Sequence, residues 1–296
     1  MTMSQTKQLS TIREWTEMIK IEHTVFALPF ALSGLVLASS QPPTFLTVLF
    51  TILAFVGARS AAMTLNRLID MRIDAKNPRT ADRALAAGRI KKSTALLFTI
   101  ASFGLMLAAA SQLPSLCLKL SPIAVIWLSF YSYTKRFTYL CHIVLGIALG
   151  GAALGGWIAA GGSLSQSAPW LLALAVSTWV AGFDIIYASQ DVAFDQKEKL
   201  FSMPARFGIG NALTISKVLH LITSASLMAL GLVLHLTLFF WIGFVVVLAM
   251  LFYEHSLVSK DDLSRVNAAF FTVNGVVSIL AFLAILSDRV SFWISH

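Results

Sequence analysis

The segment Asn66-Arg-Leu-Ile-Asp70-Met-Arg-Ile-Asp74 closes a long apolar stretch, and Tyr187-Ala-Ser-Gln-Asp191-Val-Ala-Phe-Asp195 closes another. Each segment places two carboxylates four residues apart, so that on a helix they share one face. Carboxylates gathered at a membrane surface repel one another unless cations lie between them. Mg²⁺ suits this position because it binds one or two carboxylates and completes its shell with phosphate oxygens and water. The two segments therefore predict a membrane protein that binds a diphosphate attached to an apolar group.

The composition indicates an integral membrane protein. The chain is 57% hydrophobic and 12% charged, with a mean hydropathy of +0.78. Soluble domains carry about 25% charged residues. The apolar stretches are mostly about 20 residues long, enough to cross a hydrocarbon core of roughly 30 Å as helices. The alternating pattern of a membrane barrel is missing, so the predicted fold class is an all-α polytopic membrane protein.

The apolar stretches predict a single transmembrane domain over residues 21–296, preceded by a short segment, 1–20. That segment lacks the pattern of a removable signal peptide, and its mixture of apolar and charged positions favours a helix in the membrane interface. The predicted spans are 22–40, 44–66, 93–111, 113–133, 141–160, 168–189, 213–234, 236–254 and 267–286.

Basic residues gather in alternate connections. The segment 67–92 holds 8 of the 22 lysines and arginines, whereas the connections 41–43 and 161–167 hold none. By the positive-inside rule, the N-terminus and both aspartate motifs lie on the cytoplasmic side and the C-terminus lies outside. This topology accounts for the net charge of +8, so nucleic acid is not expected as a partner.

Polar residues extend both motifs into the predicted helices. Arg59 lies about two turns below Asn66, and Asp184 precedes Tyr187 by three residues. Ionisable groups inside a bilayer are costly and usually line a cavity. We therefore include Arg59 and Asp184 in the candidate site. The alternative is that these two residues pair with each other as a structural bridge.

Basic residues near the motifs are candidates for binding the outer oxygens of a diphosphate, because Arg and Lys donate charge-assisted hydrogen bonds to phosphate. The alternative is a solvated rim, in which neighbouring cations merely balance the aspartates and satisfy the positive-inside rule. The candidates are Arg72, Lys76, Lys135 and Arg136.

The paired motifs at this separation resemble those of the UbiA superfamily of intramembrane prenyltransferases. The pattern Tyr131-x-Tyr-x-Lys-Arg136 and the stretch Asn77-Pro-Arg-Thr-Ala-Asp-Arg83 resemble that family as well. The chain is most similar to the 4-hydroxybenzoate polyprenyltransferase group. Stretches such as Glu22-His-Thr-Val-Phe-Ala-Leu-Pro-Phe30 are closer to a bacterial branch, some of whose members are thought to prenylate a carboxylated naphthol on the futalosine route to menaquinone.

The resemblance implies nine helices around a central cavity in a bacterial cytoplasmic membrane. It implies Mg²⁺-dependent transfer of a polyprenyl group from its diphosphate to an aromatic acid, in ubiquinone or menaquinone biosynthesis. In the second motif, Tyr187 holds the position that corresponds to the asparagine of the first motif, where it could serve as the polar partner. The metal-binding residues implied are Asp70, Asp74, Asp191 and Asp195, with Asn66 completing the first motif.

The two inner residues have expected roles in this chemistry. Arg59 is the first choice to bind the carboxylate of the aromatic acid, and Asp184 is a candidate to orient or deprotonate its phenol. A rival reading is a transporter of a lipid phosphate, because intramembrane charges on paired helices also suit a carrier. The aspartates, however, lie at one rim, whereas a carrier binds its substrate near the midplane.

Overall fold

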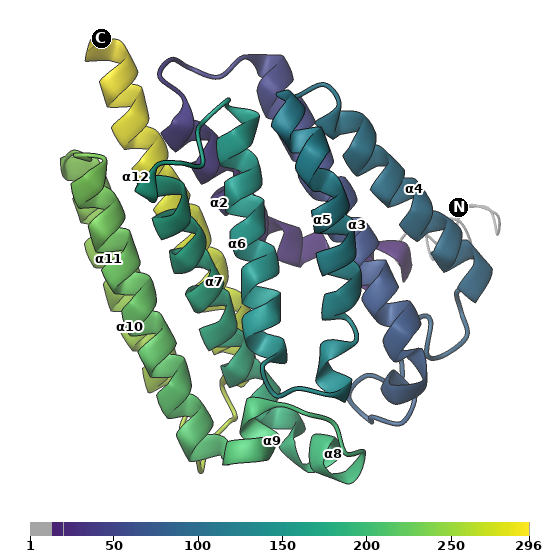
Figure 1. Ribbon diagram of the computed structural model, residues 1–296. Coiled ribbons are helices and arrows are strands. Elements are labelled where there is room, and N and C mark those ends of the chain that lie inside the picture. Colours follow the sequence, from purple (N-terminus) through teal and green to yellow (C-terminus); the bar gives the residue numbers. More distant parts are fainter. Residues whose placement is uncertain (1–13, 20, 296) are drawn as a thin grey trace, which may run out of the picture.

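The computed structural model describes residues 14–19 and 21–295, with side chains from Ala27 onward in the second range, and this part of the chain contains only helices and their connections. The long helices pack as a bundle (Figure 1). They are α2 (Ile21–Ala38), α3 (Phe45–Asp74), α4 (Lys92–Ala110), α5 (Ser115–Tyr131), α6 (Cys141–Ala159), α7 (Ser167–Ala188), α10 (Ile209–Val233), α11 (Leu238–Ser256) and α12 (Asn274–Ser295). The short ones are η1 (Thr134–Arg136), η2 (Ser189–Asp191), α8 (Val192–Lys197), α9 (Met203–Phe207) and η3 (Ala268–Val273).

The predicted spans correspond to these long helices. Within the described residues, 8 helices have the length and apolar composition to cross a membrane. The first predicted span coincides with α2, whose part Ala27–Ala38 is also apolar. The largest differences are at two ends, because α3 continues past residue 66 to Asp74 and α12 continues past 286 to Ser295. The predicted all-α, multi-pass fold class is confirmed.

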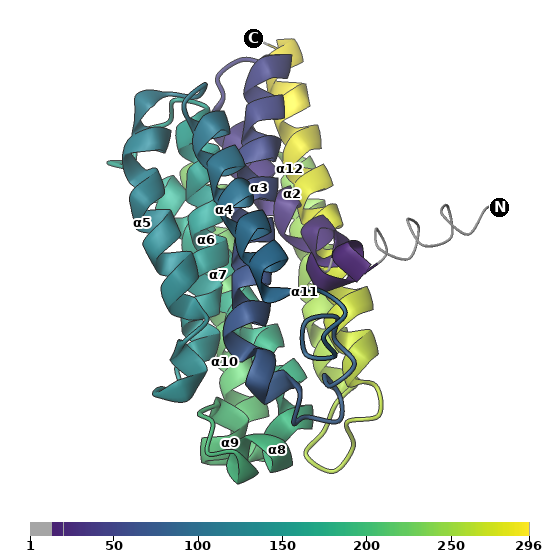
Figure 2. The same cartoon turned by 90° about the vertical axis from the view of Figure 1, so that its right-hand side faces the viewer.

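Helix α7 is the most enclosed of the membrane helices, with α6 and α10 packed along it (Figures 1 and 2). Glycines on α6 permit this packing, because a side chain at Gly146 would collide with the backbone of α7 at Ser177. On the other face of α6, a side chain at Gly156 would collide with the Ala31 carbonyl of α2. Small residues allow such close approach of membrane helices, and here they let α7 pack closely between its neighbours.

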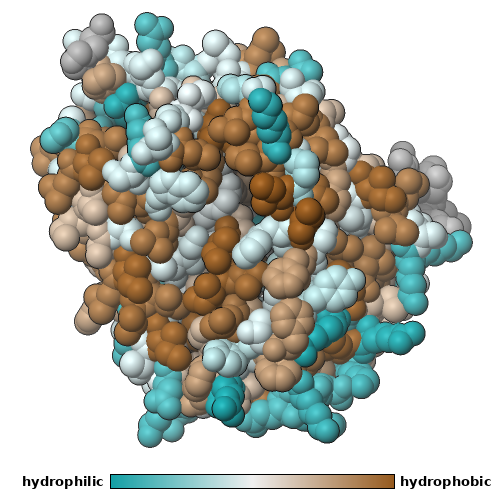
Figure 3. Space-filling view, viewed as in Figure 1, coloured by the Kyte–Doolittle hydropathy of each residue, from teal (hydrophilic) through white to brown (hydrophobic). Residues whose placement is uncertain are grey.

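The outer surface is apolar around the middle of the bundle (Figure 3). Large apolar side chains are exposed on the membrane helices, including Leu97 at 66%, Ile126 at 68% and Phe252 at 81%. Polar side chains gather at the two ends, most densely at the lower end in this view. A surface of this kind suits contact with lipid, as expected of a multi-pass membrane protein.

The described part of the N-terminal segment, residues 14–19, is helical and packs on the chain itself. Met18 is buried in a small cluster with Leu85 and Ile90. The Trp15 ring lies 4.7 Å from that of Phe98 on α4. Residues 1–13 and 20 lie outside the described residues, so the interfacial position of segment 1–20 stays a prediction.

Candidate functional site

The first aspartate motif occupies the last turns of α3, which remains helical through Asp74. Asn66 Nδ2 donates to Asp70 Oδ2 at 3.0 Å, as expected for residues four apart on a helix. Each carboxylate also holds a cation. Asp70 Oδ1 is 2.8 Å from Arg136 Nη2, and Asp74 Oδ1 is 2.6 Å from Arg83 Nη1. The motif therefore presents two carboxylates that are already paired with arginines.

The second motif does not continue one α-helix. Helix α7 ends at Ala188, a 3₁₀ turn (η2) carries Asp191, and the short α8 carries Asp195. The expectation that these two carboxylates share one α-helical face is therefore wrong in detail. Asp195 is fully buried, with Oδ1 2.8 Å from Lys135 Nζ. Neither of its buried oxygens has a hydrogen-bond partner among the described residues, so the contact with Lys135 is an ion pair.

The connection that follows α3 reaches across to the second motif. Arg79 forms a two-point contact with Asp191, with Nε 2.9 Å from Oδ1 and Nη2 2.5 Å from Oδ2. Arg79 Nη1 also donates to Tyr187 Oη at 3.1 Å, and Asn77 Nδ2 donates to Asp191 Oδ1 at 3.3 Å. Partial burial acts to lower the pKa of Arg79, but the bonds and charge of Asp191 raise it above its ordinary value. Both motifs thus form one cluster at one end of the bundle (Figure 1).

Of the predicted diphosphate-binding cations, Lys135 and Arg136 contact motif carboxylates directly. Lys76 instead pairs with Glu198, with Nζ 2.5 Å from Oε2. Arg72 is exposed and has no ion pair with any described residue. Three residues outside the predicted set also belong to the cluster, namely Asn77, Arg79 and Arg83.

Arg59 and Asp184 lie deeper and do not pair with each other, so the alternative of a mutual bridge is wrong. Asp184 Oδ2 is 2.6 Å from His142 Nδ1. Arg59 Nε is buried without a hydrogen-bond partner in the described part of the chain. His142 was not among the predicted site residues, although an ionisable residue at the start of a predicted span is itself a signal of function.

The oxygen donors fit Mg²⁺ bound together with a diphosphate. No group of three or more His, Cys, Asp or Glu among the described residues is placed to hold a metal alone. Mg²⁺ usually binds one or two carboxylates and takes its other ligands from phosphate and water, so two separate carboxylate pairs are a suitable donor set. The buried Oδ2 of Asp195, which has no hydrogen-bond partner among the described residues, is an oxygen of the kind that Mg²⁺ binds. The arginines and the lysine that now pair with the carboxylates are hydrogen-bond donors of the kind that bind a diphosphate.

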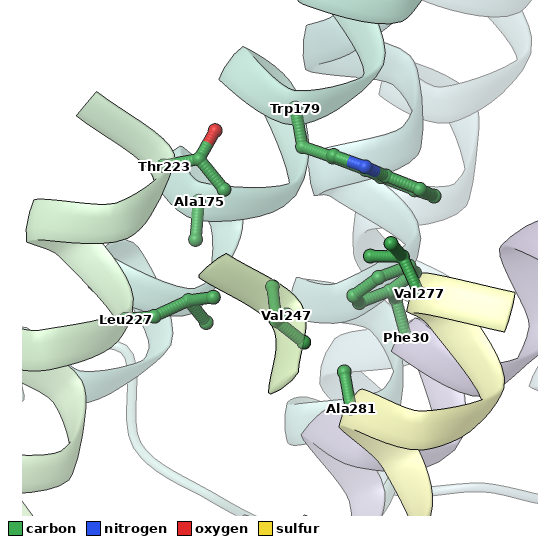
Figure 4. Close-up of a pocket in the computed structure, with 8 residues that line it drawn as sticks. All are labelled: Phe30, Ala175, Trp179, Thr223, Leu227, Val247, Val277 and Ala281. Atoms are coloured by element: carbon green, nitrogen blue, oxygen red, sulfur yellow. The ribbon is translucent and has the colours of Figure 1, made fainter. Parts of the chain in front are cut away.

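Two cavities differ in their relation to this cluster. A void of about 10 Å³ inside the bundle is lined by Thr223 and by apolar side chains, among them Phe30 and Trp179 (Figure 4). Such a space is barely large enough for one water and is not a substrate site. A second cavity of about 270 Å³ lies beside the second motif, between Asp195 and Arg206. This cavity therefore lies at the end of the bundle that carries the aspartate motifs.

Comparison with known proteins identifies the fold and the chemistry together. The sequence pattern of the UbiA prenyltransferase family matches residues 27–283. The chain belongs to the UbiA prenyltransferase family. It is therefore an enzyme, a membrane-bound prenyltransferase, and the resemblance read from its motifs is confirmed.

Individual relatives agree with this assignment. The 4-hydroxybenzoate octaprenyltransferase of Pseudomonas putida (strain GB-1) is 32% identical over 266 residues, which cover 87% of this chain and 86% of that protein. The apo structure of a UbiA homologue from Aeropyrum pernix K1 is 34% identical, with a TM-score of 0.83 over 90% of this chain and 98% of that one. A UbiA homologue from Archaeoglobus fulgidus, solved with DMAPP and Mg²⁺, shares the fold at 20% identity, with a TM-score of 0.76 over 93% and 99% of the two chains.

Proposed function

We propose that this UbiA-family enzyme transfers a polyprenyl group from an allylic polyprenyl diphosphate to 4-hydroxybenzoate or a closely similar aromatic acid, in the biosynthesis of a respiratory quinone. The observation that carries the proposal is the cluster in which Asp70, Asp74, Asp191 and Asp195 are each paired with an arginine or lysine at one end of the bundle. The names of relatives such as the Pseudomonas putida enzyme support the choice of acceptor.

The four carboxylates would hold Mg²⁺, with Asn66 beside Asp70. The A. fulgidus homologue solved with DMAPP and Mg²⁺ supports this assignment. When bound, the metal would neutralise the charge that develops on the departing diphosphate. Arg79, Lys135 and Arg136 would then exchange their carboxylate partners for outer oxygens of the diphosphate, because charge-assisted bonds from Arg and Lys suit phosphate.

The deeper residues would bind the acceptor. An aromatic acid brings a carboxylate into the bilayer, and a buried guanidinium with an unused Nε–H offers it a charged donor. Arg59 therefore binds the acceptor carboxylate, while Asp184 faces its phenol. The helices exclude water, which protects the allylic cation formed when the C–O bond of the diphosphate breaks. The ring carbon next to the hydroxyl then forms the new C–C bond, and loss of the ring proton restores aromaticity.

The density of basic residues at the end that bears both motifs supports a cytoplasmic orientation for that end, with the C-terminus outside. The bacterial relatives support a location in the cytoplasmic membrane. Diphosphate and the aromatic acid would then enter from the cytoplasm, while the polyprenyl tail lies among the apolar side chains in contact with lipid.

The proposal is tested with the purified full chain in detergent, Mg²⁺ and a labelled polyprenyl diphosphate. We expect a prenylated product from 4-hydroxybenzoate. If only a carboxylated naphthol is prenylated, that compound is the acceptor in place of 4-hydroxybenzoate. If neither aromatic acid is prenylated, the proposal is contradicted. Arg59→Ala should raise the acceptor KM by about 10- to 100-fold, since a hydrogen bond to a charged group is worth about 1.5–3 kcal/mol. The donor KM should stay near that of the Lys260→Ala control, a residue with a 72% exposed side chain.

A further inference from the structure

His142 is a buried ionisable residue in contact with Asp184. It lies in the first turn of α6 and is 2% exposed. Its Nδ1 is 2.6 Å from Asp184 Oδ2 on α7, and its Nε2 is 3.4 Å from the backbone nitrogen of Met203 at the start of α9. The imidazole is therefore held on both sides by different elements of the fold.

These two contacts fix the tautomer of the ring. A backbone N–H can only donate, so Nε2, which faces the Met203 nitrogen, accepts. In the neutral imidazole the proton then resides on Nδ1, where it is donated to the Asp184 carboxylate. With this tautomer His142 donates to Asp184 in a defined direction.

The hydrogen bond leaves one oxygen of Asp184 available. Oδ2 is held by His142, whereas Oδ1 makes no hydrogen bond within the described residues and the side chain is 25% exposed. Asp184 on α7 and Arg59 on α3 both lie further into their helices than the aspartate motifs.

We propose that His142 is a positioning residue that holds Asp184 so that Oδ1 accepts the hydroxyl proton of the aromatic acceptor, an inference that rests on the proposed transfer to a phenol. The C–O bond of the diphosphate breaks first, with its electron pair leaving on the diphosphate, and the hydroxyl proton moves to Oδ1 as the ring carbon bonds to the resulting allylic cation. The ring proton is then released and the hydroxyl proton returns from Asp184. One diphosphate and one proton leave per turnover.

Variants of His142 separate this role from simple helix packing. His142→Ala should lower kcat by about 10- to 100-fold, the usual cost of losing a partner that orients a functional side chain, while the KM of the prenyl diphosphate changes little. His142→Asn should restore most of kcat, because its amide N–H can take the place of Nδ1–H. In an Asp184→Asn background, His142→Ala should cause little further loss, since residues that act as one unit are not additive. As a control, Ser216→Ala removes another buried contact to α7, the hydrogen bond to the Gly182 carbonyl, and should leave kcat unchanged.

A spectroscopic measurement tests the pair without turnover. In the full chain labelled with ¹⁵N-histidine, the signal that disappears in His142→Asn should have the Nδ1–H tautomer and should shift in Asp184→Asn. An Nε2–H tautomer, additive losses in the double variant, or equal losses in His142→Ala and Ser216→Ala would overturn the inference. If the wild type has the expected tautomer but prenylates no phenolic acid, the His142–Asp184 contact is confirmed. The proposed function, and with it the role of this contact in catalysis, is then contradicted.

Discussion

The two aspartate motifs carry the same charge at the same spacing, yet the chain builds them differently. The first lies on the uninterrupted α3, and Asp70 receives an amide hydrogen bond from Asn66 of its own helix at 3.0 Å. The second is divided by the turn η2, and Asp191 receives its amide bond at 3.3 Å from Asn77, which follows α3. The second motif has no asparagine of its own, and Asn77 from the connection after α3 supplies the corresponding amide hydrogen bond.

This difference shows that the two halves of the site are not independent. The first motif is organised by helical spacing, with Arg136 and Arg83 as partners. The second depends on a connection that arrives from another helix, through Arg79 and Asn77. Changes at Asn77 or Arg79 should therefore disturb the second motif and spare the first, whereas loss of a carboxylate from either motif should lower activity to a similar extent.

The largest effects are expected from the carboxylates themselves. Asp70→Asn and Asp191→Asn should each lower kcat by about 10²–10³-fold, the usual cost of losing one preorganised charge contact to the transition state. Removal of Mg²⁺ with a chelator should lower the rate at least as far, and added Mg²⁺ should restore it. Asp82→Asn is the matched control, because that side chain is 98% exposed and lies outside the cluster. Full activity of either motif variant would contradict the shared role.

A smaller effect is expected when residue 79 keeps its positive charge but loses its two-point hydrogen bonding to Asp191. Arg79→Lys keeps the charge but loses the planar fork that bonds both oxygens of Asp191. The kcat/KM for the prenyl diphosphate should fall by about tenfold, equivalent to about 1.4 kcal/mol. Arg89→Lys, in the same connection but paired with exposed Asp82, should have little effect. Equal values for the two variants would show that the second motif does not depend on the two-point contact.

The two asparagines offer a more sensitive comparison. Asn66→Ala and Asn77→Ala each remove one amide bond to a carboxylate, so each should reduce kcat/KM by up to about tenfold, from a net hydrogen-bond energy of about 0.5–1.5 kcal/mol. The two losses should be similar if the amides have the same role. A loss confined to Asn66→Ala would mean that Asn77 merely shapes the connection.

The smallest effect should come from the exposed ion pair between Lys76 and Glu198. The Lys76 side chain is 61% exposed, and exposed pairs contribute about 0–1 kcal/mol. Lys76→Ala should therefore change kcat/KM by less than about fivefold. A larger loss would indicate that Lys76 itself contacts the diphosphate, as predicted from the sequence.

The sequence predicted the parts of this structure that depend on local pattern. The membrane helices follow from the length of the apolar stretches, and the Asn66–Asp70 contact follows from spacing on one helix. The turn at η2 was not predicted, because nothing in the local residue types breaks the helical pattern. The contacts of Asp191 with Arg79 and of Asp184 with His142 join residues 112 and 42 positions apart, and only the packing of the bundle brings such residues together.

The most direct test of the shared site is the binding of a polyprenyl thiodiphosphate, which resists ionisation, to the wild type, Asp74→Asn and Asp195→Asn, each with and without Mg²⁺. The two-motif account predicts binding that requires Mg²⁺ and is weakened by at least about tenfold in either variant, since each loses a charged contact to the bound diphosphate and its metal. Wild-type affinity in one of the two variants would contradict it, because that motif would then have no part in holding the diphosphate.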